Sequence, residues 1–568
     1  MTATSPYFQP YTMGSDELSL TLLPVQEKSS FEDKDVSGTP KEEVAGLPTS
    51  APTRGKLPLG WKLAIIILTC LCTFGNHWFN GLIVAQKTTI IKTLEINNSE
   101  FATLVAVTNL VNTFLCVALG FGIDKWGGPL LSIYLTLFHL AGSAIEAGSV
   151  TGHLRSYPVL VLGKVVAAVG DGSLDNAQHR IFSTYFAPGK GFASSIGIIW
   201  SIANLAQYTG QTTANVITQN LGSFSWSLWI STGISFFSSI CAIGVFFLDR
   251  YLRKIYDITD QTSGLRHVGA SKTGVFKLNA IRYMPATFWF IVLFAIFENA
   301  GVQSFVSIST QFAQQRLKKG AVVGGWVASM YLLLPIGLTP FIGIFVDLFG
   351  HRITLLFMSG LTFLVSMLLL KFSHTVPTFV AAYVMYALSQ SITPAPQVEI
   401  IRSVLPDPQY FATAFAIKKS VVQASIVIIT TAAGKLQDLS ATNSLDPAVT
   451  LWLSYAAASV IVSGGLLAVS YTTLLPAAHL SQVKPALLDL SIQRLWRERQ
   501  AAQGADETED VDPKNRECIL KLPVNPRMLW HWVYAGLSVG IIILGWIMFG
   551  LGVNWGVHGS VIAGTTGE

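Results

Sequence analysis

Twelve long apolar runs, arranged as two sets of six, constrain the fold of this chain more than any other feature. A bilayer core of about 30 Å needs about 20 apolar residues per helix, which is the length of each run. Charged residues make up 12% of the sequence, against about 25% in soluble domains, so we expect the runs to span a membrane. They begin near Lys62, Phe101, Pro129, Tyr157, Phe192 and Trp226, and then near Thr287, Val322, Ile353, Val376, Phe411 and Leu451.

A glycine-rich loop with one aspartate occurs at the same place in each set of six. The glycines allow a tight turn between closely packed helices, and the aspartate can accept hydrogen bonds from a neighbouring helix N-terminus. Two copies in register indicate two homologous six-helix halves. Both copies resemble the signature loops of the major facilitator superfamily of transporters, although Lys125 stands where an arginine is common. The signature positions are Gly120, Asp124, Lys125 and Gly127 in the first copy, and Gly343, Asp347, Gly350 and Arg352 in the second.

The resemblance implies an all-α membrane protein of two six-helix bundles, which we place at residues 58–248 and 286–475. We expect a cytosolic connector at 249–285 and a cytosolic amphipathic and acidic segment at 476–527. Residues 528–554 are apolar and long enough to form an extra, thirteenth transmembrane helix.

The first 57 residues are rich in Ser, Thr, Pro and charge, and we expect a disordered cytosolic tail. Within it, Leu22-Leu23 follows two acidic residues, as in sorting signals that direct proteins to lysosomes or vacuoles. A stray apolar patch in a tail explains these leucines equally well.

Loop charges predict the orientation of the chain. The connector carries seven basic residues, and by the positive-inside rule it faces the cytosol together with the N-terminus. The loop after the first helix then faces the lumen or the exterior. It holds the sequon Asn97-Asn98-Ser99, which predicts a glycosylated Asn97.

The sequence contains no Walker motif, no complete dinucleotide-binding loop and no metal-ligand spacing. We therefore expect no enzymatic activity, no ATP-driven pumping, and no cofactor or metal. A net charge of +5, with the basic residues in loops, also argues against a nucleic-acid partner.

Polar side chains inside the apolar runs are the remaining candidates for chemistry, because burying them in a membrane is costly. On the fourth helix, Lys164, Asp171, Asp175 and Gln178 fall on one stripe at 100° per residue. Lys164 and the two aspartates are candidates for proton coupling, with Lys164 neutralised by the aspartates; an interhelical ion-pair network is the alternative. The other candidate substrate-binding residues are Asn76, Asn80, Asn204, Gln207, Glu298, Gln303, Gln390, Gln397, Lys419 and Gln423.

The fourth helix also carries a closer resemblance. Gly163-Lys164, Gly170, Ser173-Leu174, Ala177-Gln178, Tyr185-Phe186 and Gly189-Lys190 are similar to the lysosomal dipeptide transporter branch of the superfamily. Two departures concern the substrate anchors of that branch. Gly172 occupies the position of a glutamate that meets the peptide amino group, and Asn204 aligns with an arginine that meets its carboxylate.

The branch implies alternating-access export of dipeptides or related amino-acid-like solutes from a lysosome or vacuole, by uniport or linked to protons. It also implies a single-pass accessory membrane protein as a partner. A proton-coupled symporter or antiporter for another organic anion or drug is the alternative within this class, with the plasma membrane as the alternative location. A non-transporting nutrient sensor or membrane scaffold is the alternative from another class. For a zwitterion, we expect Asp171 or Asp175 to meet the ammonium and Lys419 to meet the carboxylate, with Lys418 as the competitor.

Overall fold

In the computed structural model, every regular element of the described residues is a helix. The described residues are 57–152, 154–186, 191–256, 284–318, 320–404, 411–440, 443–472, 475, 478–479, 481–484 and 528–559. The tail with Leu22-Leu23, most of the predicted connector and most of the amphipathic and acidic segment therefore lie outside them.

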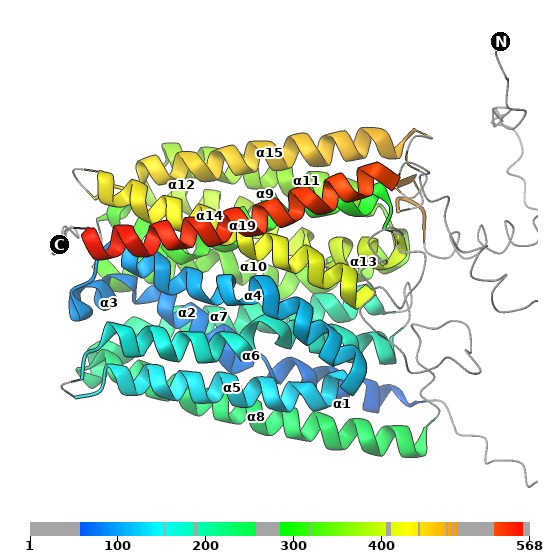
Figure 1. The fold of residues 1–568 in the computed structure, drawn as a ribbon, viewed down its shortest axis with the longest axis horizontal. Helices are drawn as coiled ribbons and strands as arrows, with labels where there is room; N and C mark the ends of the chain where they lie inside the picture. Colours follow the sequence, from blue (N-terminus) through cyan, green and yellow to red (C-terminus); the bar gives the residue numbers. More distant parts are fainter. Residues whose placement is uncertain are drawn as a thin grey trace, which may run out of the picture. The chain divides into compact units, whose positions relative to one another are not determined.

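The first half of the chain supplies eight helices (Figure 1). Its first predicted span is broken into two helices at Cys72 and Thr73, and just beyond the break the backbone N–H of Gly75 donates to Ser238 Oγ, at 3.0 Å. Gly75 also passes so close to the eighth helix that a Cβ on it would lie 2.7 Å from Ser235 Cα. The helices are α1 (Leu59–Leu71), α2 (Phe74–Ala85), α3 (Lys87–Leu94), α4 (Asn98–Trp126), α5 (Gly128–Ser149), α6 (Tyr157–Tyr185), α7 (Phe192–Leu221) and α8 (Phe224–Ile255).

The second half repeats this pattern. Its fourth predicted span is divided between Ile392 and Pro394, because a proline has no N–H to continue the helical ladder. Pro394 and Pro396 lie at this break. The helices are α9 (Ala286–Leu317), α10 (Gly320–Phe349), α11 (Arg352–Phe372), α12 (Val376–Ile392), α13 (Pro394–Val404), α14 (Phe411–Leu439) and α15 (Asp446–Ser470), followed by α19 (Met528–His558).

Eleven segments of the described residues are long and apolar enough to cross a membrane. Helices α7 and α12 of the bundle are not among these segments. Helix α7 is less apolar, because it carries several amides and hydroxyls, and α12 is short, with 17 residues. The predicted extra helix is present as α19, whose 29 residues from Trp530 to His558 form one of the eleven segments.

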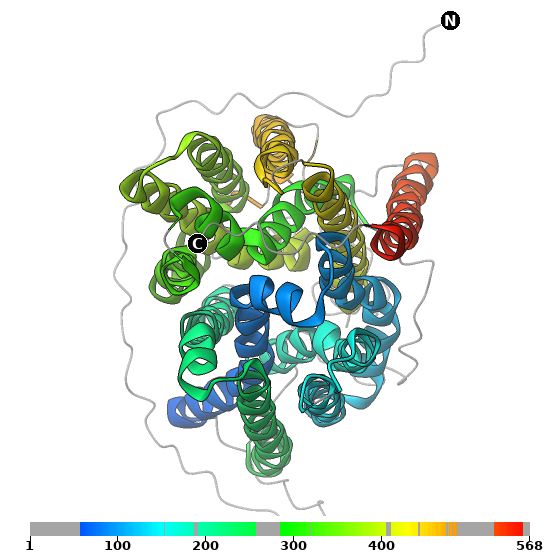
Figure 2. The same ribbon diagram turned by 90° about the vertical axis from the view of Figure 1, so that its left-hand side faces the viewer.

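The two halves lie side by side, as the view along the helices shows (Figure 2). Helices of the first half gather on one side and helices of the second half on the other, with α19 at the outer edge. Between the halves, α4 packs against α14 and α7 packs against α10. We call the end of the bundle where α1 begins the α1 end, and the opposite end, where α3 lies, the α3 end (Figure 1).

The signature loops form the tight turns that their glycines predict. Gly127, with φ of +92°, is the single residue between α4 and α5, and a left-handed backbone at Gly350 ends α10. Gly343 allows α10 to touch α7, since a Cβ there would lie 2.5 Å from the carbonyl oxygen of Ala193. The Asp124 side chain is not among those described, so the contacts of the first loop's aspartate stay a prediction.

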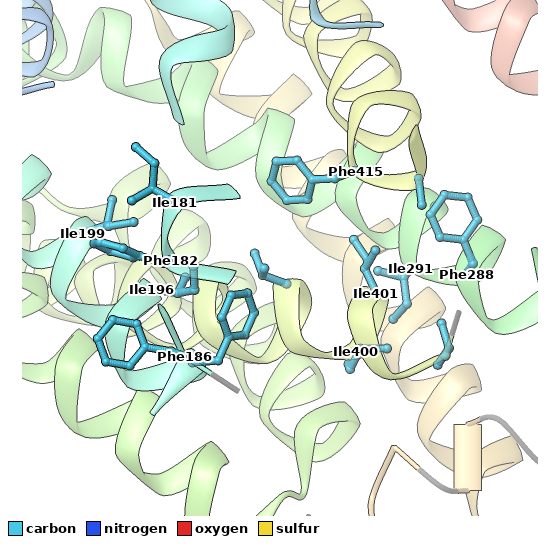
Figure 3. Close-up of a cluster of buried hydrophobic side chains, with 14 of the residues drawn as sticks. Ile181, Phe182, Phe186, Ile196, Ile199, Phe288, Ile291, Ile400, Ile401 and Phe415 are labelled. Carbon is cyan, nitrogen blue, oxygen red and sulfur yellow. The ribbon is translucent and has the colours of Figure 1, made fainter. Parts of the chain in front are cut away.

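A hydrophobic cluster joins the halves toward the α1 end (Figure 3). Phe182 and Ile196 come from the first half, while Ile401 and Phe415 come from the second. All four side chains are buried. Close apolar packing of this kind favours a state in which the halves meet on this side of the bundle.

The surroundings of Asn97 argue against the predicted glycosylation. It is 2% exposed and forms a capping box with Glu100 at the start of α4. Its Nδ2, the atom to which a glycan would attach, donates instead to the carbonyl oxygen of Gly556 on α19, at 2.8 Å. The sequon pattern describes only three residues in sequence and carries no information about a helix that packs over them from more than 400 residues away.

We expect the protein produced in a eukaryotic host to carry no glycan at Asn97. Its gel mobility should be unchanged by an amide-cleaving glycosidase and by Asn97→Gln. Loss of the capping and α19 contacts in Asn97→Ala should lower the free energy of unfolding by about 1–2 kcal/mol. A mobility shift that disappears in Asn97→Gln would show that α19 docks elsewhere.

Candidate functional site

A cavity of about 300 Å³ lies between the two halves at the middle of the bundle. Its lining mixes apolar side chains with a few charged and amide groups, which is typical of a small-molecule site. Most of the predicted residues line it, namely Asn80, Lys164, Asp171, Asp175, Gln207, Glu298, Gln303, Gln390, Gln397, Lys419 and Gln423.

An ion pair crosses the cavity from one half to the other. Lys419 Nζ, on α14, lies 3.1 Å from Asp175 Oδ2 on α6. His77 Nε2, on α2, lies 4.0 Å from the other oxygen of the same carboxylate. Both members of the pair keep some exposure to the cavity, 15% for Lys419 and 25% for Asp175. A negative and a positive group therefore face each other from opposite halves.

Asp171 is held by a second set of contacts within the first half. Its carboxylate accepts a hydrogen bond from Asn76 Nδ2, and Asn76 in turn accepts from Asn80 at 3.3 Å. Asn76 does not line the cavity but orients a carboxylate that does.

Lys164 forms no ion pair with Asp171 or Asp175, the aspartates expected to neutralise it. Its ammonium lies 4.5 Å from the centre of the Phe79 ring, and no carboxylate oxygen of the described residues lies within 4.0 Å of it. A cation over an aromatic face is attracted by the ring quadrupole. The stripe on α6 correctly places Lys164 at the cavity but cannot show that Lys419, from another helix, reaches Asp175 first.

The second half has its own polar network around Glu298. Three hydroxyls donate to Glu298 Oε1, from Ser359 (2.9 Å), Ser389 (3.1 Å) and Thr393 (2.7 Å). The Asn299 amide, with its nitrogen toward the carboxylate, lies 2.6 Å from Glu298 Oε2 and 3.2 Å from Lys418 Nζ.

The network continues to a buried cation. Lys418 Nζ donates to Gln397 Oε1 at 2.6 Å and lies 5.3 Å from the centre of the Phe415 ring. Lys418, unlike Lys419, stays within its own half. The two neighbouring lysines thus serve different networks, and only Lys419 bridges the halves.

Besides Asn76, two predicted residues do not line the cavity. Gln178 donates to the Thr69 carbonyl (2.7 Å) and to Thr73 Oγ1 (3.0 Å), so it joins α6 to α1. Asn204 donates to the Trp200 carbonyl of its own helix and accepts from Gln390 at 3.3 Å, across the interface of the halves. Both amides therefore hold helices together, a common role for such groups in membranes.

Sequence reasoning missed three titratable residues that line the cavity: His77, Glu146 and His179. Glu146 carried a usable signal, because a lone carboxylate inside an apolar run is costly and marks a functional candidate. The histidines carried none, since nothing in the sequence indicates that His179 packs edge-on against Phe415.

A second contact between the halves lies toward the α3 end of the bundle, and we call it the latch. Asp438, on α14, accepts from Asn98 Nδ2 at 3.0 Å and from the backbone N–H of Ser99 at 3.0 Å. Ser99 Oγ donates to the same carboxylate. Gly434 permits this approach, since a Cβ there would lie 2.7 Å from Ala102 Cβ.

Lys87 extends the latch from α3. Its ammonium donates to Gln437 Oε1 at 3.3 Å. Burial of the Lys87 ammonium lowers its pKa to about 7, although the nearby Asp438 carboxylate acts in the opposite direction and raises the pKa. The ammonium is therefore fully charged only in acidic medium, where its attraction to Asp438 adds to the latch.

At the α1 end, the second signature loop makes the contact that its aspartate predicts. Asp347 accepts from the backbone N–H groups of Ala193 (3.3 Å) and Ser194 (2.9 Å) at the start of α7. Arg352, in the same loop, forms a buried ion pair of 3.4 Å with Glu399 on α13. The halves thus contact each other on both sides of the cavity.

Comparison with known proteins agrees with this architecture. The sequence model of the Major Facilitator Superfamily matches residues 302–565. The solved structure of the nucleoside transporter NupG superposes with a TM-score of 0.50 at 14% identity, covering 73% of this chain and all of NupG. A point mutant of NupG superposes with a TM-score of 0.51, also at 14% identity, and covers 72% of this chain. The chain is thus similar in sequence to the Major Facilitator Superfamily over residues 302–565, and it shares its fold with a solved nucleoside transporter.

Among individual proteins, the chain is similar to the lysosomal dipeptide transporter MFSD1. The Homo sapiens protein is 23% identical over 425 residues, which cover 71% of this chain and 86% of the relative. The Mus musculus protein is 23% identical over 395 residues, covering 67% and 81%. The resemblance drawn from the signature loops and the fourth helix is thereby confirmed.

Proposed function

We propose that this transporter carries dipeptides or related small zwitterions by alternating access. The observation that carries the proposal is the ion pair between Asp175 and Lys419, because it places opposite charges on opposite halves of one cavity. The similarity to lysosomal dipeptide transporters supports the same substrate class.

Both poles of a zwitterion can take the place of this ion pair. The substrate ammonium would bind Asp175, with Asp171 nearby, and the substrate carboxylate would bind Lys419. Burying either pole unpaired costs several kcal/mol, so a ligand with one pole would leave one member of the pair without a partner. This arrangement substitutes for the two anchors that the sequence lacks at Gly172 and Asn204. One substrate then contacts both halves, as rocking of the halves around a central site requires.

We further propose that the α1 end faces the cytosol and the α3 end faces the lumen of a lysosome or vacuole, with export toward the cytosol. The basic residues after α8 support this orientation by the positive-inside rule. The single-pass accessory protein implied by the resemblance stays a prediction.

Location can be tested in cells with Leu22→Ala combined with Leu23→Ala. We expect the double variant to move from acidic organelles to the plasma membrane, because the sorting signal is lost. An unchanged distribution would show that the two leucines are not a sorting signal.

The orientation can be tested in intact organelles, where added protease should remove an N-terminal tag from the wild-type protein. A protected tag would reverse the proposed orientation.

The decisive experiment is exchange of a labelled dipeptide across proteoliposomes that contain the full-length protein. A free dipeptide inside the vesicles should accelerate entry of the labelled one, whereas N-acetylated and C-amidated forms should compete poorly. Equal competition by simple organic acids would favour the anion transporter, with Lys418 as a further cation of the cavity. Binding without exchange would instead favour a sensor.

A further inference from the structure

Glu146, on α5, is a buried carboxylate that the proposed substrate contacts do not use. It is 1% exposed and lines the cavity together with Lys164. Its Oε1 has no hydrogen-bond partner among the described residues. The side chain packs over Gly163, where a Cβ would lie 2.6 Å from Glu146 Cγ, so α6 is shaped to leave room for it.

Charged and titratable side chains surround Glu146. Lys164 and Asp171, both on α6, are the charged groups that act on it. His139 lies on the same helix as Glu146, and both of its ring nitrogens lack a hydrogen-bond partner among the described residues. The charged residues of the other neighbours, α4 and α8, lie near the ends of those helices, where Glu100 is held in the capping box of α4.

A structural ion pair does not explain this arrangement. Lys164 lies over the Phe79 ring and not within 4.0 Å of the Glu146 carboxylate, although both side chains are buried at one cavity wall. A carboxylate kept buried with one oxygen unsatisfied is costly unless it is protonated during part of a working cycle.

We propose that Glu146 is a proton-binding site that couples movement of the substrate to movement of one proton; the coupling rests on the proposed function. A proton entering from the α3 end adds to the Glu146 carboxylate and removes its charge. The positive charge of Lys164 then acts on Asp171 and, beyond it, Asp175 without the competing charge of Glu146. Lys419 is thereby released to meet the substrate carboxylate. When the cavity opens at the α1 end, the proton leaves with the substrate, so that one proton and one substrate cross together.

The test compares two modes of transport in proteoliposomes that contain the full-length protein. Exchange of a dipeptide at equal pH needs no net proton movement, whereas uptake against a dipeptide gradient needs the proton gradient. In Glu146→Gln we expect uphill uptake to be lost while exchange changes by less than about threefold. Glu146→Asp, which keeps a carboxylate, should retain uphill uptake at a reduced rate. Glu95→Gln removes an exposed carboxylate on the loop after α3 and should behave as wild type.

Loss of exchange and uptake together in Glu146→Gln, with a correctly assembled protein, would make Glu146 structural and overturn the proposal. Wild-type uptake that carries no protons, measured with a pH-sensitive dye inside the vesicles, would overturn it as well. Absence of dipeptide exchange in the wild type would instead contradict the proposed function.

A second measurement does not depend on any substrate. N,N′-dicyclohexylcarbodiimide reacts with protonated carboxyl groups in apolar surroundings. In the purified wild-type protein it should modify Glu146, less so as the pH is raised, and mass spectrometry of the α5 peptide would detect the adduct. Glu399, buried against Arg352 and outside the cavity lining, should stay unmodified. A Glu146 that remains unmodified from acidic to alkaline pH would also overturn the proposal.

Discussion

Replacing Lys419 with methionine is expected to weaken binding of free-acid dipeptides by about 10- to 100-fold. This factor corresponds to about 1.5–3 kcal/mol for a hydrogen bond to a charged group. C-terminally amidated dipeptides should bind as before or better, since they need no cation and Asp175 no longer pairs with Lys419. Binding can be measured by competition for exchange in proteoliposomes, and stability by thermal unfolding of the same samples.

The matched control is Lys435→Met. Lys435 lies on the same helix, but its ammonium lies 5.5 Å from the centre of the Trp555 ring, outside the cavity lining. This variant should leave both kinds of ligand unaffected. Equal loss of acid and amide ligands in Lys419→Met would show that the ion pair only holds the halves together. In that case the zwitterion proposal would lose its main support.

A disulfide across the latch is expected to stop transport completely and reversibly. Ser99 Oγ contacts the Asp438 carboxylate from the opposite half, so cysteines at these two positions face each other across the closed latch and can be tested for disulfide formation. Alternating access requires the halves to separate at the α3 end, and a covalent link there prevents it. Transport should fall to background after oxidation and recover after reduction.

The single variants Ser99→Cys and Asp438→Cys are the controls and should not respond to oxidation. The four described native cysteines are buried and should not react. Cys518 lies outside the described residues and should be replaced by serine in all samples, so that the introduced cysteines are the ones that respond. Full transport by a fully cross-linked protein would mean that the latch does not open during the cycle. The fixed arrangement of α4 and α14 would then belong to a scaffold rather than to a gate.

Much of the fold could be predicted because its causes are local in sequence. Apolar length fixed the spans, and glycines fixed the turns at Gly127 and Gly350. Pro394 marked the break between α12 and α13. The interruption between α1 and α2 could not be foreseen, since the sequence there holds no proline and the contact of Gly75 with the Ser238 hydroxyl comes from α8.

The site was predictable to the level of helix faces but not of partners. The stripe on α6 placed Lys164, Asp171 and Asp175 at the cavity, yet periodicity within one helix cannot rank contacts between helices. Lys419 therefore reaches Asp175, while Lys164 rests on Phe79. Asn97 shows the same limit, because its burial depends on Gly556 at the far end of the chain.

The contacts of α19 have a practical consequence for anyone who labels this protein. Tyr534 stacks on Trp289 near the α1 end, and Gly556 lies against Asn97 at the α3 end, so α19 runs the full depth of the bundle. Because α19 adds a crossing, its two ends report on opposite compartments. In the proposed orientation, a fluorescent protein fused after α19 would be exposed to acid and to hydrolases, and its signal would fade even if the transporter were intact. A reporter placed before α1 would remain in neutral surroundings. If a pH-sensitive dye is attached at one end and an insensitive dye at the other, the ratio of their signals would show which end of each molecule faces the acidic compartment.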